Sequence, residues 1–272
     1  HFNAAMDKQD YERALAALNH LKSRDCDQKK LRKMELHFHL MQGHRDEVLK
    51  IAPQFYRIHD QEFAEFVRGK RIAIVGPAPS DDQVAEEIDQ FDIVIRTNYR
   101  GASSLPPAQD YGSKIDVSYY NYTYTKQVLF GAENDYLDDL KFAIFKNKSD
   151  LDRYRGRPTS AQFRLMNQIN DFIFNGKSQM MQNIIYDLLH FEPAEIKLFK
   201  SNFFMSNQRY YASYASPTNR EQQKNSFWLN FATHDLFTQL RFTQQIVNIK
   251  NLNSENSISH ILNMKPNKYC EE

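Results

Sequence analysis

The sequence GKRIAIVGPAPSDDQVAEEIDQFDIVIRTN, which spans Gly69 to Asn98, decides the fold. It contains two short runs rich in β-branched residues, Arg71–Val75 and Phe91–Ile95, and each is typical of a buried strand. The first run ends in a loop at residues 76–80, where glycine and proline interrupt regular structure, and residues 83–89 follow with a helical pattern. The stretch therefore predicts a strand, a loop, a helix and a second strand.

This connection predicts an anion-binding loop. Two parallel strands joined by a helix place the first loop and the helix N-terminus at the carboxyl edge of the sheet. Ser80, Asp81 and Asp82 offer side-chain oxygens to cap the helix. Because free backbone amides and the helix dipole favour negative charge, we expect a phosphate-bearing ligand at this loop.

The composition indicates a globular protein with a substantial core, since 41% of the 272 residues are hydrophobic and 25% are charged. The net charge of +1, with basic residues dispersed among acidic ones, argues against nucleic acid as a partner. Cys26 and Cys270 lie far apart, so we expect no disulfide framework and a reducing compartment. No apolar run approaches the roughly 20 residues of a membrane span. We expect a cytoplasmic protein without an integral membrane segment in this chain, or one at the membrane surface.

Residues 1–68 predict a small α-helical segment that precedes the sheet. Residues 9–15 align with residues 43–49 at an offset of 34, and a helical pattern lies between them. This period resembles a tetratricopeptide repeat, and a plain stack of helical hairpins is the alternative. Either arrangement offers a surface for a protein partner.

Residues 69–272 contain further candidate strands and helices, separated by loops. The predicted strands are 115–120, 142–145 and 195–199, the predicted helices are 160–173, 179–190 and 236–248, residues 258–264 form a last short element, and residues 99–111 and 202–225 are loops. Alternation of strands and helices predicts a single α/β domain with helices on both faces of a mostly parallel sheet.

Several segments, taken in order, resemble the sialyl motifs of family 29 sialyltransferases. The large motif is similar to Val75-Gly76 with Ser80 in the loop, Glu87-Ile88-Asp89, Phe91-Asp92-Ile93-Val94, Arg96-Thr97-Asn98 and Gly112-Ser113-Lys114. The small motif resembles Gly176-Lys177-Ser178 through Ile196-Lys197-Leu198-Phe199 to Asn202-Phe203-Phe204, the His-Tyr-Tyr element resembles Arg209-Tyr210-Tyr211, and the very small motif resembles His234 with Gln239. Together these segments span about residues 70 to 245.

The chain also departs from the family pattern. The family's asparagine in the first loop is Pro77 or Ala78 here, a glycine is Gln179, a histidine is Arg209 and a glutamate is Gln239. The cysteines that join the two large motifs in animal enzymes are absent.

The resemblance implies a fold and an activity. The implied fold is a single Rossmann-like sheet of the sialyltransferase, variant GT-A type. The implied activity is inverting transfer of an acidic sugar from a CMP-sugar donor to a glycan acceptor, with no cofactor and no catalytic metal. The sugar would be sialic acid or a related ulosonic acid such as Kdo, and polysaccharide biosynthesis would be the setting.

His234 is the candidate catalytic residue. It precedes a predicted helix, and an imidazole can remove a proton from an acceptor hydroxyl near neutral pH. The alternative is that His234 caps or packs against the start of that helix.

The candidate donor-binding residues lie at strand ends and helix starts. Asn98 and Asn121 each follow a predicted strand, where an amide can bond ribose or phosphate oxygens, although a turn-forming role is the alternative. Ser80 and Ser178 precede predicted helices and could contact the nucleotide or only cap the helices. The resemblance adds Gly76 and Pro77 in the first loop, and Arg209, Tyr210 and Tyr211 to steady the phosphate.

Two other functions stay open from the residues alone. Another Rossmann-type nucleotide-dependent enzyme is one, although the loop at residue 76 lacks the three-glycine fingerprint of dinucleotide-binding proteins. A helical-repeat interaction module with a structural α/β domain is the other. The Asp150 and Asp152 pair lies among basic residues, and His37 and His39 point away from a common helix face, so neither pair predicts a metal site.

Overall fold

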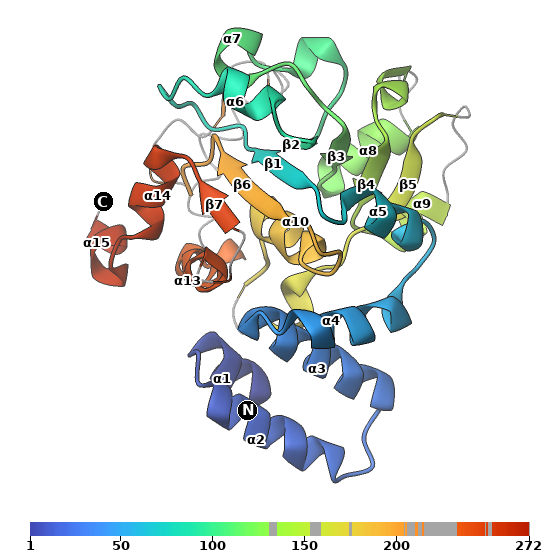
Figure 1. Ribbon diagram of the computed structural model, residues 1–272, viewed down its shortest axis with the longest axis vertical. Helices are drawn as coiled ribbons and strands as arrows, with labels where there is room; N and C mark the ends of the chain where they lie inside the picture. The colour runs from blue at the N-terminus through green and yellow to red at the C-terminus, as the bar shows by residue number, and fades with distance from the viewer. Residues whose placement is uncertain are drawn as a thin grey trace.

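The computed structural model describes residues 1–130, 135–152, 159–173, 176–203, 205, 210–211, 214, 233–247, 249 and 252–271. Within these residues, seven strands form one sheet in the order β5-β4-β3-β2-β1-β6-β7 (Figure 1), and all neighbouring strands are parallel. The strands are β1 (Arg71–Val75), β2 (Ile93–Thr97), β3 (Val117–Tyr119), β4 (Phe142–Phe145), β5 (Gln162–Leu165), β6 (Glu195–Phe199) and β7 (Leu252–Ser254). The predicted α/β fold with a single, parallel sheet is confirmed.

Helices precede the sheet in the first 68 residues, as predicted. They are α1 (Phe2–Asp7), α2 (Tyr11–Lys22), α3 (Gln28–Gln42), α4 (Arg45–Ile51) and α5 (Asp60–Val67), with the 3-10 turn η1 (Ala52–Phe55) after α4. Local chemistry sets their ends, since the carboxylates of Asp10 and Asp27 accept hydrogen bonds from backbone amides in the first turns of α2 and α3. Gly43 ends α3 in the left-handed conformation. The two aligned segments begin α2 and α4, and the likeness to a tetratricopeptide repeat stays a prediction.

Further helices and 3-10 turns lie between the strands and after β7. They are η2 (Ala102–Ser104), α6 (Ala85–Asp89), α7 (Ala108–Tyr111), α8 (Tyr122–Phe130), η3 (Asp135–Asp139), α9 (Lys148–Asp152), η4 (Ile169–Asp171), α10 (Met180–Leu188), α13 (Leu236–Val247), α14 (Asn256–Leu262) and α15 (Pro266–Glu271). No helix among the described residues is long and apolar enough to cross a membrane.

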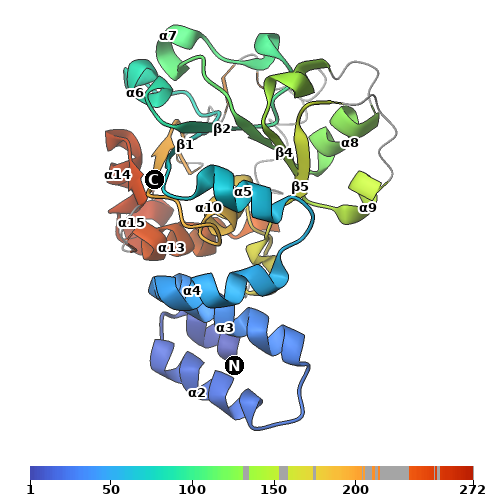
Figure 2. The same ribbon diagram turned by 45° about the vertical axis from the view of Figure 1, so that its right-hand side comes forward.

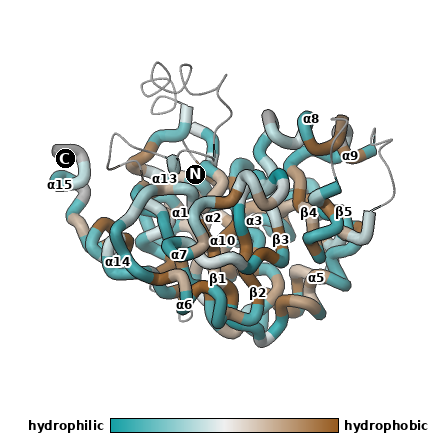
Figure 3. The backbone as a smooth tube through the Cα atoms, turned by 90° about the horizontal axis from the view of Figure 1, so that it is seen from above, coloured by the Kyte–Doolittle hydropathy of each residue, from teal (hydrophilic) through white to brown (hydrophobic). Residues whose placement is uncertain are grey.

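Helices cover both faces of the sheet, as predicted. Because side chains alternate along a strand, Ile72 and Ile74 of β1 face one side, whereas Ala73 and Val75 face the other. The first face packs against α5, α10 and α13, and its core continues into α1 to α4 (Figures 1 and 2). The second face packs against α6 and α7 beside β1, and against α8 beside β4. In Figure 3 brown, hydrophobic stretches are seen at β1, β2 and α10.

A buried ionic network fastens the helical segment to the sheet. Arg164 on β5 is fully buried, and its guanidinium donates to both carboxylate oxygens of Asp187 on α10, over 2.5 and 2.8 Å. It also donates to Asp60 at the start of α5 over 2.5 Å. Tyr119 on β3 donates its hydroxyl to Asp187 over 2.7 Å. Burial opposes the charge on Asp187, but Arg164 outweighs that effect and lowers the pKa of Asp187.

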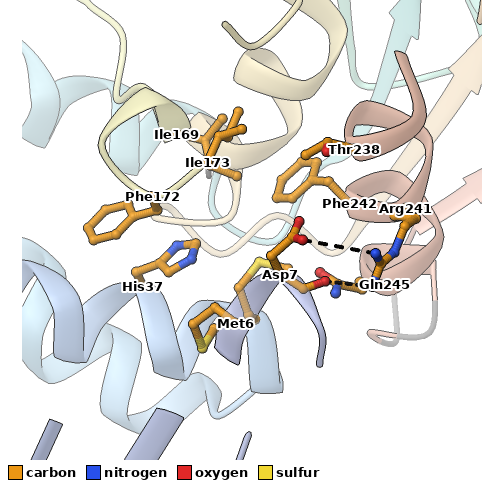
Figure 4. A pocket seen from close by; sticks show the side chains of 11 residues that line it. Met6, Asp7, His37, Ile169, Phe172, Ile173, Thr238, Arg241, Phe242 and Gln245 are labelled. Atoms are coloured by element: carbon orange, nitrogen blue, oxygen red, sulfur yellow. Dashed lines mark hydrogen bonds and ion pairs between the residues drawn. The ribbon is translucent and has the colours of Figure 1, made fainter. Parts of the chain in front are cut away.

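A second contact joins the helical segment to α13 and η4 around a small pocket (Figure 4). His37 on α3 is buried there and stacks on Phe172, with ring centroids 4.1 Å apart and nearly parallel planes. Arg241 on α13 donates to the backbone oxygen of Asp7 over 2.7 Å. The helical segment therefore packs against the sheet domain through apolar, aromatic and polar contacts.

The predicted helix over residues 160–173 is wrong. That segment forms the edge strand β5 and then the turn η4. The apolar residues of the segment fit a helical period, and a surface helix would place Arg164 in solvent. In the structure Arg164 lies in the core instead, where it pairs with two carboxylates. The strand β7 and the helix α8 were not predicted.

Candidate active site

A cleft opens at the carboxyl edge of the sheet, and its described lining comes from loops that follow five strands and from the starts of α10 and α13. The lining residues are Gly76, Pro77, Ala78, Thr97, Asn98, Asn121, Lys146, Ser178, Gln179, Met180, Met181, Ser201, Asn202, Phe203, Tyr210, Tyr214 and His234. Seven of the ten predicted site residues therefore meet in one place, although the first and the last, at 76 and 234, are 158 positions apart in the sequence.

The cleft lies at the point where the strand order reverses. The chain builds β1, β2, β3, β4 and β5 outward in one direction and then returns to place β6 on the other side of β1. The connections that follow β1 and β6 lead to helices on opposite faces of the sheet, α6 and α13, and parallel α/β sheets bind ligands outside the strand ends at such a point. Gly76 follows β1 and Ser201 follows β6, and both line the cleft.

The loop after β1 packs directly on the end of β6. The Gly76 amide donates to the carbonyl oxygen of Phe199 over 2.8 Å, and the Ala78 amide donates to that of Lys200 over 3.0 Å. A Cβ atom on Gly76 would overlap the Lys200 carbonyl oxygen, so only glycine fits. Pro77 has no N–H, so residues 76–78 cannot form the backbone-amide cradle that the sequence predicts.

Ser80 lies outside the cleft lining and does not cap α6. The helix begins at Ala85, with Val84 at its N-cap and no side-chain cap. The Ser80 hydroxyl accepts instead from the Asp82 amide over 3.2 Å. The ammonium of Lys200 donates to the carbonyl oxygens of Ser80 and Asp82, which fixes this loop.

Asn98 is the central polar contact of the cleft. It follows β2 with a φ of 56°, a left-handed conformation that asparagine tolerates better than most residues. Its amide nitrogen donates to the Tyr214 hydroxyl over 2.6 Å, and its amide oxygen accepts from the Asn121 backbone amide over 2.9 Å. Asn98 is 3% exposed, so both sides of its amide are already used to position neighbours.

Asn121 caps α8 and keeps one polar group for the cleft. Its side-chain oxygen accepts from the Tyr124 amide over 3.0 Å. Its side-chain nitrogen has no hydrogen-bond partner among the described residues. Because Asn121 is part-exposed and lines the cleft, this nitrogen can donate to a ligand.

Ser178 and the start of α10 form the opposite wall. Ser178 is buried, and its hydroxyl lies 2.5 Å from the side-chain oxygen of Asn170 and 2.8 Å from that of Asn183. Gln239 on α13 accepts from the Gln179 amide over 3.1 Å, so α10 and α13 are joined beside the cleft. The Ser178 hydroxyl is thus engaged within the protein.

His234 lines the cleft, and one hydrogen bond defines its tautomer. Its Nδ1 lies 2.7 Å from the carbonyl oxygen of Lys177, and since a carbonyl only accepts, Nδ1 carries the proton. Nε2 of the neutral ring is then left as the acceptor. Gly176 holds this contact, because at its φ of 72° a Cβ atom would press on the backbone of Thr233 and His234.

Burial and two lysines keep His234 neutral. Burial lowers the pKa of His234, the hydrogen bond to Lys177 partly opposes this, and the positive charges of Lys146 and Lys177 lower it further. The pKa of Lys146 is lowered by its own burial and by Lys177. No Asp or Glu belongs to the described lining, so the cleft is positively charged.

Of the two neighbouring tyrosines, Tyr210 lines the cleft and Tyr211 does not. Tyr210 lines the cleft, and its ring lies 4.9 Å from that of Tyr214. Tyr211 packs outside the lining, where its hydroxyl donates to the Ser104 carbonyl oxygen over 3.2 Å and its ring meets Tyr111 edge-on. Arg209 lies outside the described residues.

Sequence reasoning missed Lys146, Thr97 and Tyr214. Lys146 directly follows β4, and Thr97 ends β2, so the strand-end rule that selected Asn98 and Asn121 also applies to them. Tyr214 lies in a long polar stretch with no periodic pattern, and no sequence signal distinguishes it.

Two solved structures of mammalian sialyltransferases are similar to this chain. One, in complex with Gal-beta-1-3GalNAc-ortho-nitrophenol, has a TM-score of 0.47 and 13% sequence identity, and the match covers 81% of this chain and 85% of that chain. The other has a TM-score of 0.44 and 14% identity, and the match covers 68% of each chain. No model of a protein family matches the sequence, and no curated protein matches it significantly.

Proposed function

We propose that this protein is an inverting glycosyltransferase that moves an acidic sugar from a CMP-linked donor to a glycan acceptor. The observation that carries the proposal is that His234, a neutral imidazole whose Nδ1 is held by Lys177, lines a positively charged cleft at the strand-order reversal. A nucleotide ester of an acidic sugar is an anion, and the lysines complement its charge.

The proposed reaction is a single displacement. The acceptor hydroxyl oxygen bonds to the anomeric carbon while the bond from that carbon to the CMP phosphate oxygen breaks. The hydroxyl proton passes to Nε2 of His234, and CMP leaves with the electron pair. Attack from the side opposite CMP inverts the anomeric carbon. General-base assistance of this kind contributes roughly 10²- to 10⁴-fold to a rate.

The proposed donor position follows the topology of the cleft. The nucleotide lies at the loops after β1 and β6, against Gly76 and Pro77, and the side-chain nitrogen of Asn121 donates to a phosphate oxygen. Met180, Met181 and Phe203 supply an apolar wall for the base and ribose. The sugar then extends toward His234.

The proposal includes chemistry without a metal ion. Nucleotide-sugar enzymes that use a divalent cation hold it with carboxylates, and the described lining offers Lys146 rather than Asp or Glu. We expect turnover in the presence of excess EDTA to equal turnover with added Mg²⁺.

A donor screen tests the proposed function. Nucleotide release is measured with CMP-sialic acid, CMP-Kdo and common diphosphate sugars, and calorimetry compares binding of CMP, NAD and S-adenosylmethionine. We expect CMP binding and release of CMP from one of the acidic donors. Binding of NAD or S-adenosylmethionine with no affinity for CMP would overturn the proposal in favour of another nucleotide-dependent enzyme.

A further inference from the structure

Lys146 brings a positive charge into the cleft that nothing in the described part of the chain neutralises. It is half-buried, directly follows β4 and lines the cleft. The neighbouring charge that affects the pKa of Lys146 is the positive charge of Lys177, which lowers it. A half-buried ammonium without an acidic partner is costly, so a bound anion would stabilise this arrangement.

The place of Lys146 along the sheet separates it from the nucleotide end of the cleft. Two strands, β2 and β3, lie between β4 and β1, and neighbouring strands are about 4.8 Å apart, so β4 lies roughly 14 Å from β1. The loops at the strand-order reversal follow β1 and β6. His234, which the proposed mechanism places beside the reacting carbon, is the group whose charge Lys146 opposes. Lys146 therefore marks the sugar end.

We infer that Lys146 is a specificity-determining residue that binds the carboxylate of the acidic sugar in the donor. This inference rests on the proposed glycosyl transfer. In a ulosonic acid the carboxylate is attached to the anomeric carbon, so a cation near the reacting carbon meets that carboxylate directly. An ammonium pairs strongly with a carboxylate where solvent is partly excluded. A neutral sugar at the same position would leave Lys146 unpaired, which selects against neutral donors.

The test compares an acidic donor with the same donor whose sugar carboxylate is esterified. Wild-type protein, Lys146→Met and Lys146→Arg are assayed for kcat/KM with CMP-sialic acid and with its carboxyl methyl ester, and free CMP is used as a competitive inhibitor. Lys148→Met is the matched control, because Lys148 is exposed, pairs with Asp152 and is not part of the lining. If CMP-Kdo is the donor that the wild type uses, its methyl ester replaces that of sialic acid.

The expected result is a loss of discrimination without a loss of nucleotide affinity. Wild type should prefer the acid over the ester by roughly 10- to 100-fold, and Lys146→Met should lose most of this preference. Lys146→Arg should retain part of it, and inhibition by CMP should change less than about twofold.

Two results would overturn the inference. One is a preference for the acid that Lys146→Met leaves unchanged. The other is an equal loss of affinity for CMP and for both donors, which would place Lys146 against the phosphate. A wild-type protein that binds CMP poorly and releases it from no donor would instead overturn the proposed function, and the inference with it.

Discussion

The Nδ1 proton of His234 is held by the carbonyl oxygen of Lys177, 2.7 Å away. This contact fixes the tautomer that leaves Nε2 free to accept a proton. If His234 is the general base, His234→Ala should lower kcat by roughly 10²- to 10⁴-fold while the affinity for CMP stays within about twofold. Nucleotide-release assays measure kcat, and calorimetry measures the affinity for CMP. The control is His44→Ala, because His44 is an exposed imidazole that is not part of the described lining. Unchanged transfer in His234→Ala would show that the base lies elsewhere.

The pH dependence of transfer should report the two lysines beside His234. The pKa of His234 is lowered, so the neutral base persists through neutral pH and activity is lost only as the pH falls through a value below 6.5. Lys146→Met and Lys177→Met each remove a positive charge and should raise that pKa, which moves the acid limb of kcat/KM to higher pH. The shift should be larger for Lys146, the stronger of the two charges on His234. Identical acid limbs in all three proteins would contradict this electrostatic coupling.

Short strands with sharp boundaries could be predicted from the sequence. The predicted ranges 71–75, 142–145 and 195–199 match β1, β4 and β6, because apolar runs there end at glycine, proline or charged residues. The strand β5 could not be found, since the buried charge of Arg164 is stabilised by Asp60 and Asp187, which lie 104 and 23 positions away. Similarly, β7 has three residues, of which only Leu252 is buried, and this is too short for a pattern.

Lining residues of the cleft could be predicted from the sequence where they directly follow strands. Asn98 and Asn121 could be selected in this way, because the carboxyl ends of parallel strands share one edge of the sheet. Their roles could not be predicted, because the contact between the Asn98 amide and the Tyr214 hydroxyl depends on how a distant segment folds back. The charge of the cleft was also missed, since Lys146 lies outside every motif and its lack of an acidic partner appears only in three dimensions.

The ion pair between Arg164 and Asp187 should be among the largest single contributions to stability. Arg164→Met would leave two carboxylates, Asp60 and Asp187, in the core without their partner, and we expect a loss of about 3–5 kcal/mol in the free energy of unfolding. Urea denaturation measures the loss. Arg32→Met is the control, because Arg32 pairs with Glu35 on the surface and should cost about 1 kcal/mol or less. A loss of about 1 kcal/mol or less for Arg164→Met would contradict a buried ion pair between Arg164 and Asp187.

Buried neutral histidines should make the protein less stable in mild acid. Burial, with a smaller effect from His190, lowers the pKa of His37 to about 3, and burial lowers that of His190 to about 4. The unfolded chain therefore binds more protons below about pH 6.5, and stability falls as the pH drops toward 4. His37→Phe, which keeps an aromatic ring on Phe172, should reduce the slope by about 1.4 kcal/mol per pH unit. Urea denaturation from pH 7.5 to 4.5 measures how the free energy of unfolding depends on pH. An unchanged slope in His37→Phe would show that His37 is not buried as a neutral ring.

The close approach of Gly76 to the end of β6 should make this position intolerant of any side chain. In Gly76→Ala the new Cβ would overlap the Lys200 carbonyl oxygen, so the loop after β1 must move away from the cleft or β6 must shift. We expect a loss of about 1–3 kcal/mol in the free energy of unfolding, with at least a tenfold loss of CMP affinity. Gly69→Ala is the control for a Gly-to-Ala change without a steric clash, because nothing lies within 4 Å of the new Cβ, although the φ of 68° at Gly69 is unfavourable for alanine. That variant should lose about 1 kcal/mol of stability from backbone strain and bind CMP as the wild type does. Equal CMP binding by both variants would show that the loop after β1 does not support the nucleotide.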